Sequence, residues 1–128
     1  MSKRVSRRAE EYLEAIYELI SKGEKPGIRK LAKLLGVKPS SVLEYIRRLC
    51  REGLLKYEDG KIEFTNKGFQ IAQEIRKRHE LIKEFLILIG VSEDIADQDA
   101  CYIEHGVHEE TLNKIMEFVK KYRESKCI

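Results

Sequence analysis

Apolar residues recur every three or four positions along most of this chain, a spacing that places them on one face of an α-helix. Between Leu54 and Thr65 the pattern changes to alternation around Asp59-Gly60, a dipeptide that favours a two-residue hairpin turn. Glycine, proline and capping residues separate the periodic segments. The pattern predicts helices over residues 6–21, 28–36, 39–51, 66–89 with an interruption near His79, 93–103 and 107–122, with a hairpin over 54–65.

Three helices followed by a hairpin is the order of a winged helix-turn-helix. The turn before the third helix contains Gly36, and Pro39 suits the first turn of that helix. We therefore expect a mainly α protein with a winged helix-turn-helix DNA-binding domain over residues 1–68. A helical domain follows over residues 69–128.

Composition excludes several classes of protein. Of the 128 residues, 42% are hydrophobic and 37% charged, which is typical of a soluble globular protein. The longest apolar run, residues 85–89, is too short to span a membrane, and no signal peptide is visible. Three widely spaced cysteines, Cys50, Cys101 and Cys127, argue against a disulfide framework. We expect a cytoplasmic protein without a membrane partner.

The net charge of +3 divides unevenly along the chain. Residues 1–68 hold 16 basic and 10 acidic residues, a net of +6, whereas residues 69–128 hold 9 and 12, a net of −3. A basic half suits an anionic partner such as DNA, and an acidic half suits cations or another protein. Charge blocks that are merely solvated are the alternative explanation.

Double-stranded DNA is the partner that the first half predicts. The helix over residues 39–51 begins with hydroxyl side chains and continues with arginines, which suits contacts to phosphates and base edges in a groove. The hairpin and the basic N-terminal arm would add contacts to the DNA backbone. The predicted DNA-contacting residues are Arg4, Arg7, Lys38, Pro39, Ser40, Ser41, Glu44, Tyr45, Arg48, Tyr57 and Lys61.

Metal-ligating residue types gather in the second half. Cys101, Glu104 and His105 are spaced i, i+3 and i+4, so they project from one face of one helix and can share a divalent ion. Glu11 and Glu14 are three apart on the first helix. A pair of glutamates is usually solvated, and a lone cysteine is usually a small buried residue, so the residue types alone leave both interpretations open.

The chain resembles the diphtheria toxin repressor family of metal-dependent transcriptional repressors over nearly its whole length, particularly the short manganese transport regulator branch. The segments that carry this resemblance are EYLEAIYEL over residues 11–19, KPSSV over 38–42, RHEL over 78–81, FL over 85–86 and IEH over 103–105. The resemblance implies a second domain for metal binding and dimerisation, without the SH3-like domain of the iron branch. It also implies a homodimer that binds a palindromic operator of metal-uptake genes when metal is loaded.

Carried over residue by residue, the resemblance implies the metal ligands Glu11, Glu14, His79, Cys101, Glu104 and His105. Cys101 agrees with the iron branch, whereas the manganese branch has a carboxylate there. Lys83 and Asp97 fall where the iron branch has the Glu and His of an ancillary site. The mixed donors favour Mn²⁺ or Fe²⁺, with Co²⁺ and Zn²⁺ as further ions that can bind in vitro.

These observations predict a metal-activated repressor in which the ion neutralises the carboxylates and holds the first helix, so that the recognition helices match the operator spacing. The apolar faces of residues 81–89 and 93–103 are expected either to form the dimer interface or to fill a monomeric core. One alternative is a winged-helix regulator that metal does not control. Another, a small metallo-hydrolase, lacks any recognised catalytic motif, so we expect neither an enzyme nor a small organic substrate.

Overall fold

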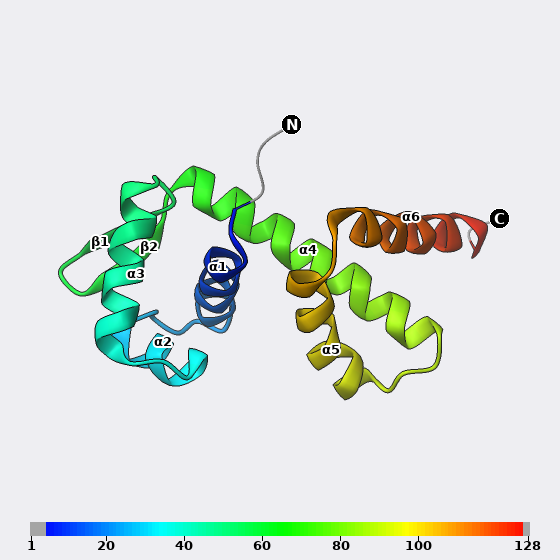
Figure 1. Ribbon diagram of the computed structural model, residues 1–128, viewed down its shortest axis with the longest axis horizontal. Helices are drawn as coiled ribbons and strands as arrows, with labels where there is room; N and C mark the ends of the chain where they lie inside the picture. The colour runs from blue at the N-terminus through cyan, green and yellow to red at the C-terminus, as the bar shows by residue number, and fades with distance from the viewer. Residues whose placement is uncertain (1–4, 127–128) are drawn as a thin grey trace. The chain divides into compact units, whose positions relative to one another are not determined.

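The computed structural model describes residues 5–126, which are mainly helical (Figure 1). The elements in these residues are α1 (Arg7–Ser21), α2 (Ile28–Leu35), α3 (Pro39–Arg51), β1 (Leu55–Glu58), β2 (Lys61–Phe64), α4 (Asn66–Leu88), α5 (Glu93–Gly106) and α6 (Glu109–Lys126). The predicted fold class, a mainly α protein with an N-terminal winged helix-turn-helix, is confirmed.

The chain divides into two compact units, Met1–Glu74 and Ile75–Ile128, and each is described by itself. The predicted domain boundary, after residue 68, lies inside α4, which contributes residues to both units. None of the described helices is both long and apolar enough to cross a membrane.

The first unit is a three-helix core with a hairpin. Helix α1 begins after Ser6, whose hydroxyl accepts a hydrogen bond from the backbone N–H of Ala9 at 3.2 Å. Gly36 ends α2 in the left-handed conformation, which turns the chain toward α3. The fully buried aliphatic side chains of this core are Leu13, Ile16, Leu31, Val42, Ile46 and Leu49.

The hairpin forms where the sequence predicts it. Asp59 and Gly60 both have positive φ, 51° and 74°, so they form the tight turn that joins two antiparallel strands. The register pairs Glu58 with Lys61 and Leu55 with Phe64. Leu55 and Ile62 are buried, so one face of the hairpin lies inward, where β1 packs on α3.

Helix α4 begins after a cap that ties it to the hairpin. The Thr65 hydroxyl donates a hydrogen bond to the Gly53 carbonyl at 2.6 Å and accepts one from the Gly68 N–H at 3.1 Å. Gly68 lies so close to the chain before β1 that a Cβ atom there would be 1.9 Å from the Leu54 carbonyl oxygen. Glycine is therefore required at this position.

The predicted interruption near His79 is wrong, because α4 is continuous from Asn66 to Leu88. His79 itself is buried and takes a position in the stripe that Ile75, Ile82 and Leu86 form. A polar residue at a buried position interrupts the regular spacing of apolar residues in the sequence, although the helix itself continues.

The second unit encloses its own small core. Its buried members are Ile82, Leu86, Ala96, Ala100 and Leu112, from α4, α5 and α6. Ile82 and Leu86, which were expected either at a dimer interface or in a monomeric core, therefore lie in the core. Ile89 and Tyr102 stay 62% and 72% exposed. Helices α5 and α6 each extend three to four residues beyond their predicted ends.

Candidate metal centre and nucleic-acid interface

Two helices of the second unit bring four predicted metal ligands together. Helix α4 supplies His79, and one face of α5 supplies Cys101, Glu104 and His105. The His79 Nδ1 atom lies 3.9 Å from the Cys101 Sγ and 3.8 Å from the Glu104 Oε2. On the other side, the His105 Nε2 lies 3.8 Å from the same Glu104 oxygen. The i, i+3 and i+4 spacing in the sequence thus produces a real cluster of donors.

The donor set fits a divalent transition-metal ion. Metal–ligand bonds of about 2.0–2.3 Å place neighbouring ligand atoms roughly 3–4 Å apart, and the pairs Cys101–His79, His79–Glu104 and Glu104–His105 each have such a separation. Glu104 and His79 are only 0% and 3% exposed, so the carboxylate and the imidazole are held in a restricted environment. Two imidazoles, a thiol and a carboxylate suit borderline ions such as Fe²⁺, Co²⁺ and Zn²⁺, and the carboxylate also suits Mn²⁺.

Two further residues contact these ligands, and the sequence pattern indicated this role for neither of them. The Asp97 Oδ1 lies 2.9 Å from the His79 Nε2, on the ring atom opposite the one that faces Cys101 and Glu104. The Arg78 Nε donates a hydrogen bond to the Glu104 Oε1 at 3.3 Å. Asp97 stands four residues before Cys101 on α5, a spacing that could have identified it.

The electrostatics of the cluster centre on His79. Its hydrogen bond with Cys101, followed by those with Glu104 and Asp97, raises the pKa of the imidazole to about 11, against the opposing effect of burial. The hydrogen bond between Asp97 and His79 also lowers the pKa of Asp97 below its usual value. An ion bound at Nδ1 would therefore replace a proton that these acidic neighbours favour.

The two positions where the iron branch has the Glu and His of an ancillary site hold an ion pair in this chain. The Lys83 ammonium lies 3.7 Å from the Asp97 Oδ1 and 3.6 Å from the Glu93 Oε1. A protonated lysine has no atom that can ligate a metal ion, and its positive charge repels one. These residues do not fit a second metal ion at this place.

Glu11 and Glu14 lie on α1 in the first unit. The Glu11 carboxylate is partly exposed and lies 3.6 Å from the Arg7 Nε. Glu14 is half-buried. Their predicted role as ligands stays a prediction.

The predicted DNA-contacting residues of α3 form an exposed face. Lys38, the N-cap residue, is followed by Pro39 at the first position, and no side chain caps the helix N-terminus. The backbone N–H groups there can meet phosphate oxygens. The exposed members of the predicted set are Arg7, Lys38, Pro39, Ser40, Ser41, Glu44, Arg48 and Lys61, whereas Tyr45 and Tyr57 are half-buried and Arg4 lies outside the described residues.

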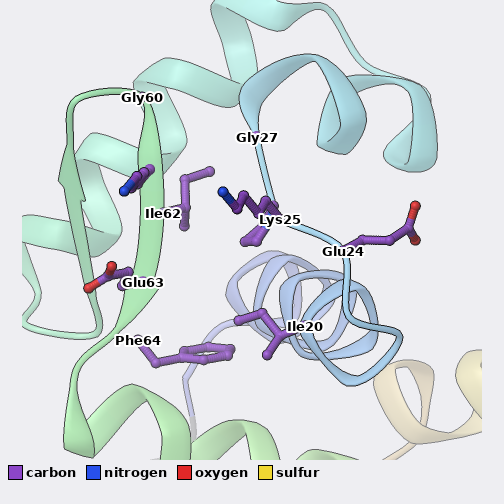
Figure 2. A pocket seen from close by; sticks show the side chains of 10 residues that line it. Ile20, Glu24, Lys25, Gly27, Gly60, Ile62, Glu63 and Phe64 are labelled. Atoms are coloured by element: carbon purple, nitrogen blue, oxygen red, sulfur yellow. The ribbon is translucent and has the colours of Figure 1, made fainter.

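A separate cavity of about 480 Å³ lies beside the hairpin in the first unit. Figure 2 shows Lys25 and Ile62 close together in it, with Ile20 and Phe64 at one end. The lining residues come from the end of α1, the α1–α2 loop and the β2 strand. They include Lys61 from the predicted DNA-contacting set and none of the predicted metal ligands.

Comparison with known protein families matches both units. One family model, described as the iron dependent repressor N-terminal DNA binding domain, matches residues 4–61. A second, described as the iron dependent repressor metal binding and dimerisation domain, matches residues 65–127. The chain belongs to the iron-dependent repressor family. This confirms the resemblance to the diphtheria toxin repressor family.

The relatives of this chain are transcriptional regulators. An uncharacterized HTH-type transcriptional regulator of Methanocaldococcus jannaschii is 37% identical over 123 residues, with 94% of this chain and 98% of that protein covered. The HTH-type transcriptional regulator MntR of Geobacillus kaustophilus is 36% identical over 116 residues, with 90% and 82% covered.

A solved structure supports the same conclusion. The complex of a manganese-dependent transcriptional repressor with manganese has a TM-score of 0.75 to this chain, at 28% identity. The match covers 88% of this chain and 52% of that longer one. The protein is thus a metal-dependent transcriptional repressor rather than an enzyme, as the sequence predicts.

Proposed function

We propose that this repressor acts as a cytoplasmic homodimer that binds a palindromic operator when Mn²⁺ or Fe²⁺ is loaded, and that it controls metal-uptake genes. The observation that carries this proposal is a row of neighbouring donors: the buried Glu104 Oε2 lies 3.8 Å from both His79 and His105, and the Cys101 thiol lies 3.9 Å from His79. The manganese-bound repressor of similar fold supports Mn²⁺ as one candidate ion.

In this proposal Glu11 and Glu14 complete the ligand set from α1. Without a cation, three carboxylates directed to one site repel each other, so α1 is held weakly. A bound divalent ion supplies the positive charge that removes this repulsion. Helix α1 is then held in a single position by its bonds to the ion. This position fixes the separation of the two recognition helices in a dimer. Operator half-sites accept only that separation.

A mobility-shift assay on the promoter region of the protein's own gene tests this proposal. With a chelator present we expect weak, non-specific binding, and with Mn²⁺ or Fe²⁺ we expect a discrete complex. Allosteric coupling of this kind typically changes the affinity for DNA by about 5–150-fold between the metal-free and the metal-loaded protein. Equal affinity with and without metal would refute metal control and leave a winged-helix regulator that metal does not control.

A further inference from the structure

Tyr45 on the recognition helix α3 contacts the beginning of helix α1. Its ring is stacked on the ring of Tyr12, with centroids 4.5 Å apart and planes at 29°. Its hydroxyl lies 3.2 Å from the Ser6 hydroxyl oxygen. Because all three residues belong to the first unit, this link is part of the fold of that unit.

The two residues at the α1 end of this link, Ser6 and Tyr12, are held in place by the fold. Ser6 is the N-cap residue and accepts a hydrogen bond from the Ala9 N–H at 3.2 Å, so its hydroxyl is fixed in position. Tyr12 is buried, and it lies in the sequence between Glu11 and Glu14. Any displacement of α1 that involves these two glutamates therefore moves the surface on which the Tyr45 ring is stacked.

The α3 side of the link reaches the predicted DNA-binding face. The Arg48 guanidinium carbon lies 5.7 Å from the centre of the Tyr45 ring, within the range of a cation–π contact. Arg48 is exposed and belongs to the predicted DNA-contacting set. The ring thus contacts α1 through Tyr12 and a DNA-facing cation through Arg48.

We propose that Tyr45 is a positioning residue that couples the state of α1 to the recognition helix, in addition to any contact it makes with DNA. Helix α1 packs on α2 and α2 on α3, whereas the Tyr12–Tyr45 stack joins α1 to α3 directly. An effector changes affinity only through contacts that differ between two states, and in this proposal the stack is such a contact. The inference rests on the proposed metal control of DNA binding.

The test is the variant Tyr45→Phe, which keeps the ring and removes the hydroxyl. Affinity for the promoter fragment is measured by fluorescence anisotropy with chelator and with saturating Mn²⁺. One hydrogen bond corresponds to a factor of about 3–10, so we expect the gain in affinity on adding Mn²⁺ to fall by that factor, beyond any equal loss with and without Mn²⁺ that a direct DNA contact would cause. By reciprocity, the gain in Mn²⁺ affinity on adding DNA falls by the same factor.

Two further variants make the result specific. Ser6→Gly removes the partner hydroxyl at a small cost in capping, so Tyr45→Phe should have no additional effect in that background. Lys67→Gln, which changes an exposed cation of the first unit outside the predicted DNA-contacting set, should leave the gain from Mn²⁺ unchanged.

Two results would overturn the role of Tyr45. A Tyr45→Phe protein that loses affinity equally with and without Mn²⁺ would show a direct DNA contact only, and one that loses none would show no role. A wild-type protein without any response to Mn²⁺ or Fe²⁺ would instead refute the proposed function on which this inference depends.

Discussion

Asp97 determines which nitrogen of the His79 ring is available to a metal ion. Its carboxylate lies 2.9 Å from Nε2, which leaves Nδ1 directed to Cys101 and Glu104. Carboxylates that hold a ligating imidazole in this way fix its orientation and increase its basicity. The hydrogen bond with His79 lowers the pKa of Asp97, and the charge of Lys83, 3.7 Å away, adds a smaller effect in the same direction.

We therefore expect Asp97→Asn to weaken metal binding. Loss of a hydrogen-bonding partner behind a metal ligand typically lowers affinity by about 10–100-fold. The measurement is calorimetric titration with Mn²⁺ at one pH. Asp99→Asn, an exposed aspartate on the same helix, is the matched control, and equal affinities in the two variants would contradict the role given to Asp97.

Cys101 is the residue expected to decide between ions. Thiolate favours softer ions than carboxylate does, so Cys101→Asp should shift the preference from Fe²⁺ toward Mn²⁺. The ratio of the Mn²⁺ and Fe²⁺ concentrations that give half-maximal DNA binding measures this preference. An unchanged ratio would mean that the thiol does not select the ion.

At the scale of elements, the junction between the hairpin and α4 depends on Gly68. A Cβ atom 1.9 Å from the Leu54 carbonyl oxygen must displace backbone. Gly68→Ala is therefore expected to lower the free energy of unfolding by about 1–3 kcal/mol, as overpacking typically does. Urea unfolding of the metal-free protein checks it.

Gly106→Ala is the control for that experiment. Gly106 is also helical, but nothing lies within 4 Å of a Cβ atom there. Alanine favours the helix, so this variant should be neutral or slightly more stable. Equal destabilisation of both variants would show that helix geometry, and not the contact with Leu54, is responsible.

Most elements could be predicted from the sequence because their signals are local. Asp59-Gly60, Pro39 and Gly36 each act on their own backbone, and the structure has the expected hairpin and helix starts. The continuity of α4 could not be predicted, since burial of His79 depends on packing with distant residues. In the same way, the spacing of Cys101 and its neighbours gave the cluster on α5, whereas the Tyr12–Tyr45 stack joins residues that no sequence pattern relates.

At the scale of the whole molecule, the second unit exposes large apolar side chains. Ile89 and Ile95, at the end of α4 and the start of α5, are 62% and 47% exposed. The proposed homodimer would cover such side chains. The family model of this unit includes dimerisation in its description.

Ile95→Asp should therefore shift the protein from dimer to monomer in sedimentation experiments. Operator affinity should fall by more than about tenfold, because two linked half-site contacts become independent. Leu34→Asp, which changes an exposed apolar residue of the first unit, should leave the dimer intact. A dimeric Ile95→Asp protein would place the interface elsewhere.

Arg78 provides the buried Glu104 with a counter-charge that belongs to the chain itself. We therefore expect the second unit to fold without a metal ion, unlike small zinc domains that unfold without metal. A chelator should leave the far-ultraviolet circular dichroism unchanged while lowering the melting temperature, since a ligand at 100 times its Kd adds about 2.7 kcal/mol. The free energy of metal binding is then not consumed in building the fold. It remains available to shift the population between two folded states of the repressor.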